Sequence, residues 1–431
     1  VWFVFANASM QPHATYFAGL VLSFAALVTA WVAHYYRDRL STLERIVEPL
    51  FVTLGMIWWT LSHLDQINQM ASGDRFDALL VGLIALTGAL TTAAAWRLDW
   101  PGLRRVALLM LPLSVAVLIV ALWNDTSHLF AQGGWIAWIA AFGVLVASFW
   151  AFDAPLRDHV RGRLLHAGTL WLLAVLVAIE VSWHVPLSPF ASVWPNLPTG
   201  LVSVVLALAT LAAARAGFWP FGTWSRAYVG WGVGGLLVLA AVWGTGMASW
   251  SADPSPLPYL PLANPVDLTL GLGIAALVIT LRMARRREML SPVDVRKVGG
   301  FAVALVFVWL NATVARSVHF YAGVAYDIDA LMSSSTFQSA VTIFWSAVGV
   351  IAMTIAARKS SRLVWQASAI LLGLAVLKLF LVDLANLSLL VRIGTFLVVG
   401  VFLISVGYLA PAPPKQGVPE LGESEAAEVD S

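Results

Sequence analysis

The chain has 431 residues, of which 60% are hydrophobic and only 11% are charged. Soluble domains carry about 25% charged residues, so this composition excludes an ordinary soluble protein and is typical of a polytopic membrane protein. The formal net charge of +2 conceals a basic membrane body, because Glu420–Asp430 holds five of the 23 acidic residues. The absence of cysteine excludes disulfides, thiolate metal sites and thiol nucleophiles.

Apolar windows of about 20 residues, the length needed to cross the hydrocarbon core, predict thirteen transmembrane helices. They lie at 14–36, 43–63, 76–98, 103–123, 130–152, 162–184, 198–218, 226–250, 266–284, 299–319, 336–357, 363–384 and 388–409. These runs are long and lack polar alternation, so they favour an all-α helical bundle over a β-barrel. Pro49 and Pro112 predict kinks, because proline removes a backbone hydrogen bond in a helix interior.

The sequence predicts three parts. Residues 1–13 form an outer N-terminal segment, 14–410 a multi-helix transmembrane domain, and 411–431 a disordered acidic cytoplasmic tail, because its Pro, Gly, Glu and Ala residues cannot bury a core. The chain begins with Val1 and shows no signal peptide. Val1–Phe5 is typical of the end of an earlier span, so we expect a longer chain.

Basic residues predict the orientation. Cytoplasmic loops of membrane proteins are enriched in Lys and Arg, and 21 of the 25 basic residues fall in the loops after helices 1, 3, 5, 7, 9 and 11 or in the tail. The remaining four are Arg75, Arg316, Lys378 and Arg392. This alternation predicts an outer N-terminus, a cytoplasmic C-terminus and Arg316 near the outer face. The predicted location is the bacterial cytoplasmic (inner) membrane.

Glu180 and His184 form the first candidate site. They are four residues apart, so they share one face of a helix. A carboxylate beside an imidazole can act as a general base or hold a substrate, and it can supply two ligands to a metal. The alternative is an interfacial ion pair beside the aromatic belt. No HExxH motif occurs, so neither a metal nor another cofactor is expected.

Arg316 and His319 form the second candidate, with Asn311 deeper on the same predicted helix. Ionisable groups at membrane depth are costly and usually face a protein interior or a cavity. An arginine can bind a carboxylate or phosphate through two parallel hydrogen bonds. The alternative is that Arg316 reaches lipid phosphates and pairs with Asp327 or Asp329.

Two further groups carry candidate residues. Asp383 and Arg392 flank a tight turn and can pair across it as a structural link, whereas Lys378, about a turn deeper, is the better functional candidate. His63 and Asp65 are two residues apart and cannot both point inward from a regular helix. Gly230, Gly232 and Gly235 match the GxGxxG pattern of dinucleotide-binding sites. They lie inside a predicted span with no preceding strand, so the match does not indicate such a site. Gly230 and Gly234 instead predict close helix packing.

Several of these residues resemble a known bacterial family. They are Arg316-Ser-Val-His319-Phe-Tyr-Ala-Gly323, Gln338, Ile343-Phe-Trp345, Lys378-Leu-Phe-Leu-Val-Asp383-Leu, Arg392 and Gly407-Tyr408, together with Leu260-Pro-Leu-Ala-Asn264-Pro-Val-Asp267. The run from about Tyr259 to Pro411 resembles the C-terminal region of large predicted membrane proteins called domain of unknown function twenty-three thirty-nine. Where members often show two adjacent histidines, this chain has His319-Phe320. The resemblance implies a membrane architecture and assigns no reaction.

Three functions follow from the outer polar residues. The first is binding or transport of a polar or anionic envelope-related molecule, which can be a small molecule, a lipid or an envelope polymer. The second is an intramembrane enzyme that transfers an acyl or glycosyl group at the outer face, with Glu180, His184 or His319 as the base. The third is a structural envelope-assembly factor. The expected partner in each case is the lipid bilayer, and no nucleic-acid surface is expected.

Overall fold

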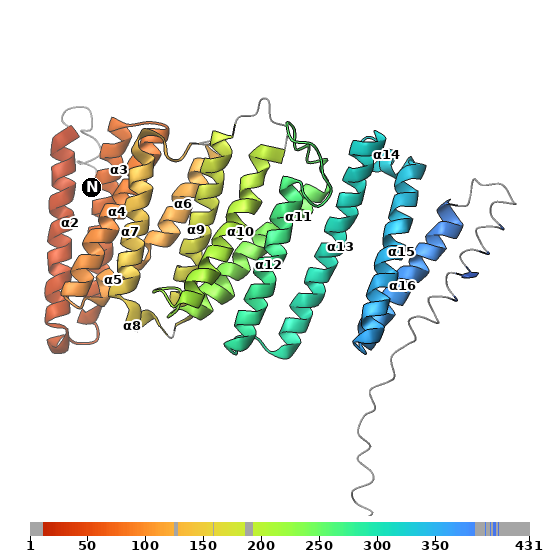
Figure 1. The fold of residues 1–431 in the computed structure, drawn as a ribbon. Coiled ribbons are helices and arrows are strands. Elements are labelled where there is room, and N and C mark those ends of the chain that lie inside the picture. The colour runs from red at the N-terminus through yellow and green to blue at the C-terminus, as the bar shows by residue number, and fades with distance from the viewer. Residues whose placement is uncertain are drawn as a thin grey trace, which may run out of the picture. The chain divides into compact units, whose positions relative to one another are not determined.

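The protein is described by a computed structural model that covers residues 12–124, 128–157, 159–185 and 193–383, together with Ile393, Leu397, Gly400, Val401 and Ile404. Over these residues every regular element is a helix and none is a strand, as Figure 1 shows. The all-α prediction is therefore confirmed. The predicted tail 411–431, nearly all of the segment 1–13, and most of the predicted span 388–409 lie outside the described residues.

The longer helices occur in the following order. They are α2 (Pro12–Tyr35), α3 (Val47–Met70), α4 (Asp74–Arg97), α5 (Pro101–Leu108), α6 (Met110–Trp123), α7 (Gly134–Ala151), α8 (Asp153–Leu156), α9 (Val160–His184), α10 (Val193–Ala216), α11 (Val233–Ala248), α12 (Pro265–Arg286), α13 (Pro292–Ala322), α14 (Ile328–Ser333), α15 (Ser335–Arg358) and α16 (Arg362–Lys378). A π-helical segment, η4 (Arg226–Gly232), precedes α11, and another, η5 (Leu379–Asp383), follows α16. Short 3₁₀ turns lie at Arg37–Arg39 (η1), Glu44–Ile46 (η2) and Ala131–Gly133 (η3).

Eleven helical stretches in the described residues are long and apolar enough to cross a membrane. They coincide with eleven of the thirteen predicted spans. The predicted span 43–63 forms α3, which has 24 residues but is not one of the eleven. The direction in which the helices cross the membrane stays a prediction.

The chain folds as two compact units, each described by itself. Unit 1 runs to Met247 and adds Ala252–Pro258 and Ala263–Leu305. Unit 2 takes Ala248–Ser251 and Tyr259–Leu262 and continues from Val306. Glu180 and His184 therefore belong to unit 1, whereas Asn311, Arg316, His319 and Lys378 belong to unit 2.

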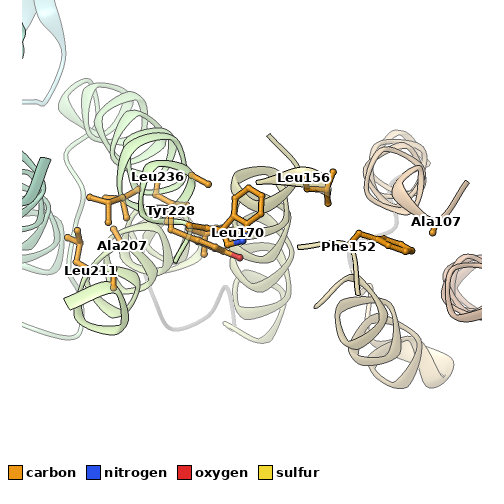
Figure 2. Close-up of a cluster of buried hydrophobic side chains, with 14 of the residues drawn as sticks. Ala107, Phe152, Leu156, Leu170, Ala207, Leu211, Tyr228 and Leu236 are labelled. Carbon is orange, nitrogen blue, oxygen red and sulfur yellow. The ribbon is translucent and has the colours of Figure 1, made fainter. Parts of the chain in front are cut away.

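The core of unit 1 is built largely from alanine, leucine and aromatic side chains. Figure 2 shows one cluster, in which Leu170 of α9, Leu211 of α10 and Tyr228 of η4 lie among buried neighbours. A second cluster joins α4, α6, α7 and α9 through residues such as Ala85, Ala137 and Leu176. Lipid tails are as apolar as leucine, so membrane helices associate mainly through close packing, which small residues permit.

The two prolines act differently. Pro112 lies in the first turn of α6, and the helical path breaks just before it, at Leu109 between α5 and α6. This break fits the predicted kink, since proline disfavours continuation of a helix through it. Pro49 lies in the first turn of α3, where a missing N–H group costs no intrahelical bond. It marks the start of that helix and does not produce an interior kink.

The predicted packing role of Gly230 and Gly234 is wrong. A Cβ atom added at either position would meet no atom within 4 Å. The close approach to α9 is made instead by Gly232, whose added Cβ would lie 3.0 Å from Leu170, and by Gly235, whose Cβ would lie within 3.0 Å of the Trp171 indole. The glycines are spaced as on a helix face, but the face that packs against α9 carries Gly232 and Gly235 and not Gly230 and Gly234.

Candidate functional site

The most unusual polar cluster of unit 1 lies at the end of α9. Glu180 is only 5% exposed, and its Oε2 atom accepts a 3.3 Å hydrogen bond from the backbone N–H of Phe130. His128 Nδ1 lies 2.9 Å from Glu180 Oε1, and His184 Nδ1 lies 3.6 Å from the same oxygen. The predicted shared face of Glu180 and His184 is confirmed, and His128 is an additional member.

Aromatic contacts fix both imidazole rings. The His128 ring stacks on Trp183 with a centroid distance of 3.9 Å and an interplanar angle of 10°. His184 Nδ1 lies 2.9 Å from the backbone oxygen of Glu180, and its ring meets His128 edge to face at 5.5 Å. A stacked ring cannot rotate freely toward the carboxylate. Despite the short distance, Glu180 Oε1 and His128 Nδ1 are not aligned for a hydrogen bond, and neither has such a partner among the described residues.

Two other carboxylates of unit 1 provide a comparison. Glu48 Oε1 accepts a 2.9 Å hydrogen bond from the Trp100 indole, and His34 stacks on that indole. Asp153 Oδ1 accepts a 2.6 Å hydrogen bond from the Trp224 indole. Buried polar groups are almost always hydrogen-bonded, and these carboxylates follow that rule. The Glu180 cluster likewise contains a carboxylate, a histidine and a tryptophan, but the Oε1 atom of Glu180 has no hydrogen-bond donor among the described residues.

Asp153 lies in the short helix α8, before the other end of α9. Partial burial raises the pKa of this carboxyl. Hydrogen bonds from the Trp224 indole and from Arg157, with the charge of Arg157, outweigh that effect and hold the pKa below its ordinary value. On α9, the buried His166 stacks on Trp224 at 4.1 Å and lies 3.0 Å, through Nδ1, from the hydroxyl of Tyr228. The arrangement joins α8, α9 and η4.

Arg316 belongs to unit 2, and among the residues that the structure describes it is the largest fully buried side chain, with 1% exposure. Its Nε atom donates a 3.3 Å hydrogen bond to the backbone oxygen of Trp250. The Tyr326 hydroxyl donates to the nearby backbone oxygen of Ala248 at 2.7 Å. A guanidinium that binds a backbone carbonyl in a buried position ties a loop to a helix. Arg316 makes this contact between α13 and the segment that contains Trp250.

The neighbours of Arg316 act in the same way. His319 Nδ1 lies 2.7 Å from the backbone oxygen of Val324, across the turn that ends α13. Asp327 caps α14, because its side chain accepts hydrogen bonds from the backbone N–H groups of Asp329 and Ala330. The Tyr321 hydroxyl donates to the backbone oxygen of Tyr259 at 2.8 Å. These contacts hold the loops around α13 and α14.

Asn311 and Lys378 link helices of unit 2. Asn311 donates through Nδ2 to Phe307 O at 2.8 Å and accepts through Oδ1 from the Trp345 indole at 2.9 Å. Lys378 Nζ donates to Gln338 O at 2.9 Å and to Thr342 Oγ1 at 2.8 Å. The first residue joins α13 to α15, and the second joins α16 to α15.

The remaining candidates are not brought together into a site. In unit 1, His63 Nε2 lies 3.2 Å from the Tyr16 hydroxyl and Nδ1 lies 2.8 Å from Trp59 O. Asp65 accepts a hydrogen bond from Gln69 at the surface. The side chain of Asp383 and all of Arg392 lie outside the described residues, so their predicted pairing stays a prediction. A site shared by Glu180 and Arg316 also stays a prediction, because the two residues belong to different units.

Sequence reasoning left His128 out of the candidate site. Its signal was present in the sequence, since Trp123 ends the fourth predicted span and Asn124 and His128 follow it, much as Glu180 and His184 end the sixth. The pairing of two residues 52 positions apart, however, depends on which helices are neighbours. Helical periodicity does not provide that information.

A family model described as "Predicted membrane protein (DUF2339)" matches residues 3–413. The resemblance to this family is therefore confirmed. The match covers nearly the whole chain, so the restriction of the resemblance to the C-terminal region, from about Tyr259 to Pro411, is not borne out. Searches of curated proteins and of solved structures gave no match.

Proposed function

The chain belongs to the DUF2339 family of predicted membrane proteins, and we propose that it binds or transports a polar, envelope-related molecule. The proposed site is the cluster of Glu180, His128 and His184. One observation carries this proposal. Glu180 is buried, yet its Oε1 atom accepts no hydrogen bond from the described residues. A buried polar atom left in this state costs about 1–3 kcal/mol, and a ligand that donates a hydrogen bond would remove that cost.

The geometry narrows the ligand class. The open Oε1 atom of Glu180 is a hydrogen-bond acceptor, so it favours a ligand with an ammonium or hydroxyl donor over an anion that only accepts. His184 is largely exposed, so the cluster is accessible from the end of α9. The molecule that fits is polar, with an N–H or O–H donor directed at Glu180.

The cations of unit 2 have a different role. Arg316 and Lys378 donate to backbone and hydroxyl groups of neighbouring segments, which is what a residue that joins helices does. We infer that unit 2 supports the fold and does not supply an anion site.

An enzyme is the second candidate, and the 2.9 Å approach of His128 Nδ1 to Glu180 Oε1 favours it. A rotation of the Glu180 carboxyl group would align a carboxylate–imidazole pair, which can act as a general base. Acyl or glycosyl transfer to an envelope molecule at the outer face would use this pair. The binding proposal needs only the acceptor oxygen and therefore comes first.

Native mass spectrometry of the protein, extracted from its membrane in a mild nonionic detergent, tests the proposal. We expect the parent to carry a co-purified polar or amphipathic molecule, and Glu180→Gln and His128→Phe to lose it. Phenylalanine can keep the stack on Trp183 while it removes the imidazole nitrogens. The matched control is Glu48→Gln, which alters a carboxylate that the Trp100 indole already satisfies. Retention of the same molecules by the parent and by both cluster variants would refute the proposal.

A further inference from the structure

An open apolar groove runs along α4 and α7 in unit 1. Its cavity volume is about 500 Å³, within the range of about 300–1,000 Å³ that is usual for small-molecule sites. Small residues form much of its lining on both helices, namely Ala78, Gly82, Ala85 and Ala89 on α4 and Ala137 and Ala140 on α7. The missing side-chain volume creates the groove.

The walls of the groove face outward. Leu79 and Leu86 of α4 and Ile136 of α7 line it and are exposed, whereas Ala85 and Ala137 are buried at its floor. Both helices are candidate membrane spans. An exposed apolar surface on a spanning helix meets the hydrocarbon of the bilayer. The groove therefore opens toward lipid chains and not toward water.

One end of the groove lies close to the polar cluster. Gln132 and Gly133, in the turn before α7, line that end. Phe130, two residues earlier, donates its backbone N–H to Glu180 Oε2. Consecutive Cα atoms are 3.8 Å apart, so two residues span at most about 7.6 Å. This short turn thus connects the lining of the groove to the backbone group that Glu180 binds.

We propose that this groove and the Glu180 cluster together form a site for one phospholipid that has a primary ammonium headgroup. The proposal rests on the proposed function, since it names the class of molecule that Glu180 binds. An acyl chain occupies the groove along α4 and α7. The headgroup ammonium donates a hydrogen bond to Glu180 Oε1, the buried oxygen that has no other donor among the described residues.

The headgroup chemistry follows from the acceptor. A primary ammonium carries three N–H donors, whereas a quaternary choline group carries none and cannot satisfy a hydrogen-bond acceptor. A phosphatidylglycerol headgroup offers hydroxyl donors but brings a net negative charge toward the Glu180 carboxylate. The His184 imidazole has Nδ1 directed at the Glu180 backbone oxygen and is largely exposed, so its Nε2 atom, which binds none of the described residues, can donate to the lipid phosphate. The site therefore favours the zwitterionic amine lipid.

Two glycines allow a matched test of the groove. Gly82 lines it and Gly143, on α7, does not. A Cβ atom at either position would meet nothing within 4 Å, so the fold tolerates a side chain at both. Gly82→Leu fills the groove, and Gly143→Leu adds the same side chain to a spanning helix outside it.

The experiment titrates detergent-purified protein with defined lipids and counts bound lipids by native mass spectrometry. The probes are phosphatidylethanolamine, phosphatidylcholine and phosphatidylglycerol with identical chains, and water-soluble glycerophosphoethanolamine, which has the same headgroup without chains. We expect the parent to prefer phosphatidylethanolamine over phosphatidylcholine by about tenfold, as one charge-assisted hydrogen bond implies. Glu180→Gln should abolish this preference, Gly82→Leu should weaken binding of every lipid, and Gly143→Leu should match the parent.

The outcomes separate the two proposals. If glycerophosphoethanolamine binds the parent as well as the lipid does, and only Glu180→Gln changes this, the polar site stands and the lipid assignment fails. If Glu180→Gln alters the binding of no probe, and also retains every molecule that co-purifies with the parent, both fail. If Gly82→Leu changes the oligomeric state while lipid binding is unaffected, the groove holds a helix of another protein and the lipid assignment is overturned.

Discussion

Gly235→Ala is the sharpest test of how α9 packs against α11. The added Cβ would lie within 3.0 Å of Nε1, Cε2 and Cζ2 of the Trp171 indole, which is closer than van der Waals contact allows. The indole cannot retreat without loss, because its Nε1 atom donates a 2.9 Å hydrogen bond to Gly232 O on the same helical segment. The substitution must therefore displace an anchored, rigid ring.

The expected cost can be worked out from these contacts. Overpacking a tight site costs about 1–3 kcal/mol, and the weakened indole hydrogen bond adds about 1 kcal/mol. Replacing glycine by alanine in a helix returns up to about 1 kcal/mol. We expect Gly235→Ala to destabilise the protein by about 1–3 kcal/mol. Gly234→Ala, one position away with nothing within 4 Å of its Cβ, should be neutral or slightly stabilising.

Titration with sodium dodecyl sulfate, followed by far-ultraviolet circular dichroism, measures the free energy of unfolding of both variants against the parent. Helical content is a suitable signal, since the 21 tryptophans would obscure a single change in fluorescence. Equal stability of the Gly234→Ala and Gly235→Ala variants would refute the packing argument. A larger loss in Gly234→Ala would restore the packing role that the sequence assigned to Gly234.

Three further predictions follow. In the folded protein the pKa of Asp153 is lower than its ordinary value of 3.8, so its carboxylate contributes stability above pH 3.8 and loses it as the pH falls through the folded value. Asp153→Asn should remove this contribution, so the free energy of unfolding, measured between pH 2 and 7, should depend on pH less in the variant than in the parent. Identical pH profiles would contradict this. Lys378→Met removes two hydrogen bonds between α16 and α15 and should lower the free energy of unfolding by about 1–3 kcal/mol. Unchanged stability together with lost ligand binding would instead make Lys378 a functional residue. The chain has no cysteine, so the single variants Ser72→Cys, in a predicted outer loop, and Ser360→Cys, in a predicted cytoplasmic loop, report the orientation of the protein. A membrane-impermeant maleimide applied to intact cells should label the first variant and not the second. The reverse pattern would overturn the predicted topology.

The helices were predictable because each is a local property of the sequence. Twenty apolar residues have few stable options inside a bilayer other than a helix, and the long apolar runs specify this directly. Even the end of α5 at Leu108 follows from Pro112, four residues away. The capping of α12 by Asn264, which accepts hydrogen bonds from the backbone N–H groups of Val266 and Asp267, also follows from the local order Asn-Pro-Val-Asp.

The contacts between helices were not predictable in the same way. The spacing of Gly230 and Gly234 shows that they share a face, but it does not show which face meets α9. The surroundings of Arg316 could not be read from the sequence for a related reason. A cation near the end of a span is equally compatible with a ligand site and with a buried backbone contact, and only the position of Trp250 O distinguishes the two.

The comparison among carboxylates explains why Glu180, and not Arg316, is the centre of the candidate site. A carboxylate that serves only to join helices gains most when its buried oxygen has a donor, as the Trp100 indole provides for Glu48 Oε1. At Glu180 the indole of Trp183 lies against the His128 ring instead. The stack holds His128 beside the carboxylate, whose Oε1 atom has no hydrogen-bond donor in the described part of the chain. This difference supports the proposal that Glu180 binds a ligand, because a binding site needs an acceptor that is held in place without a protein donor.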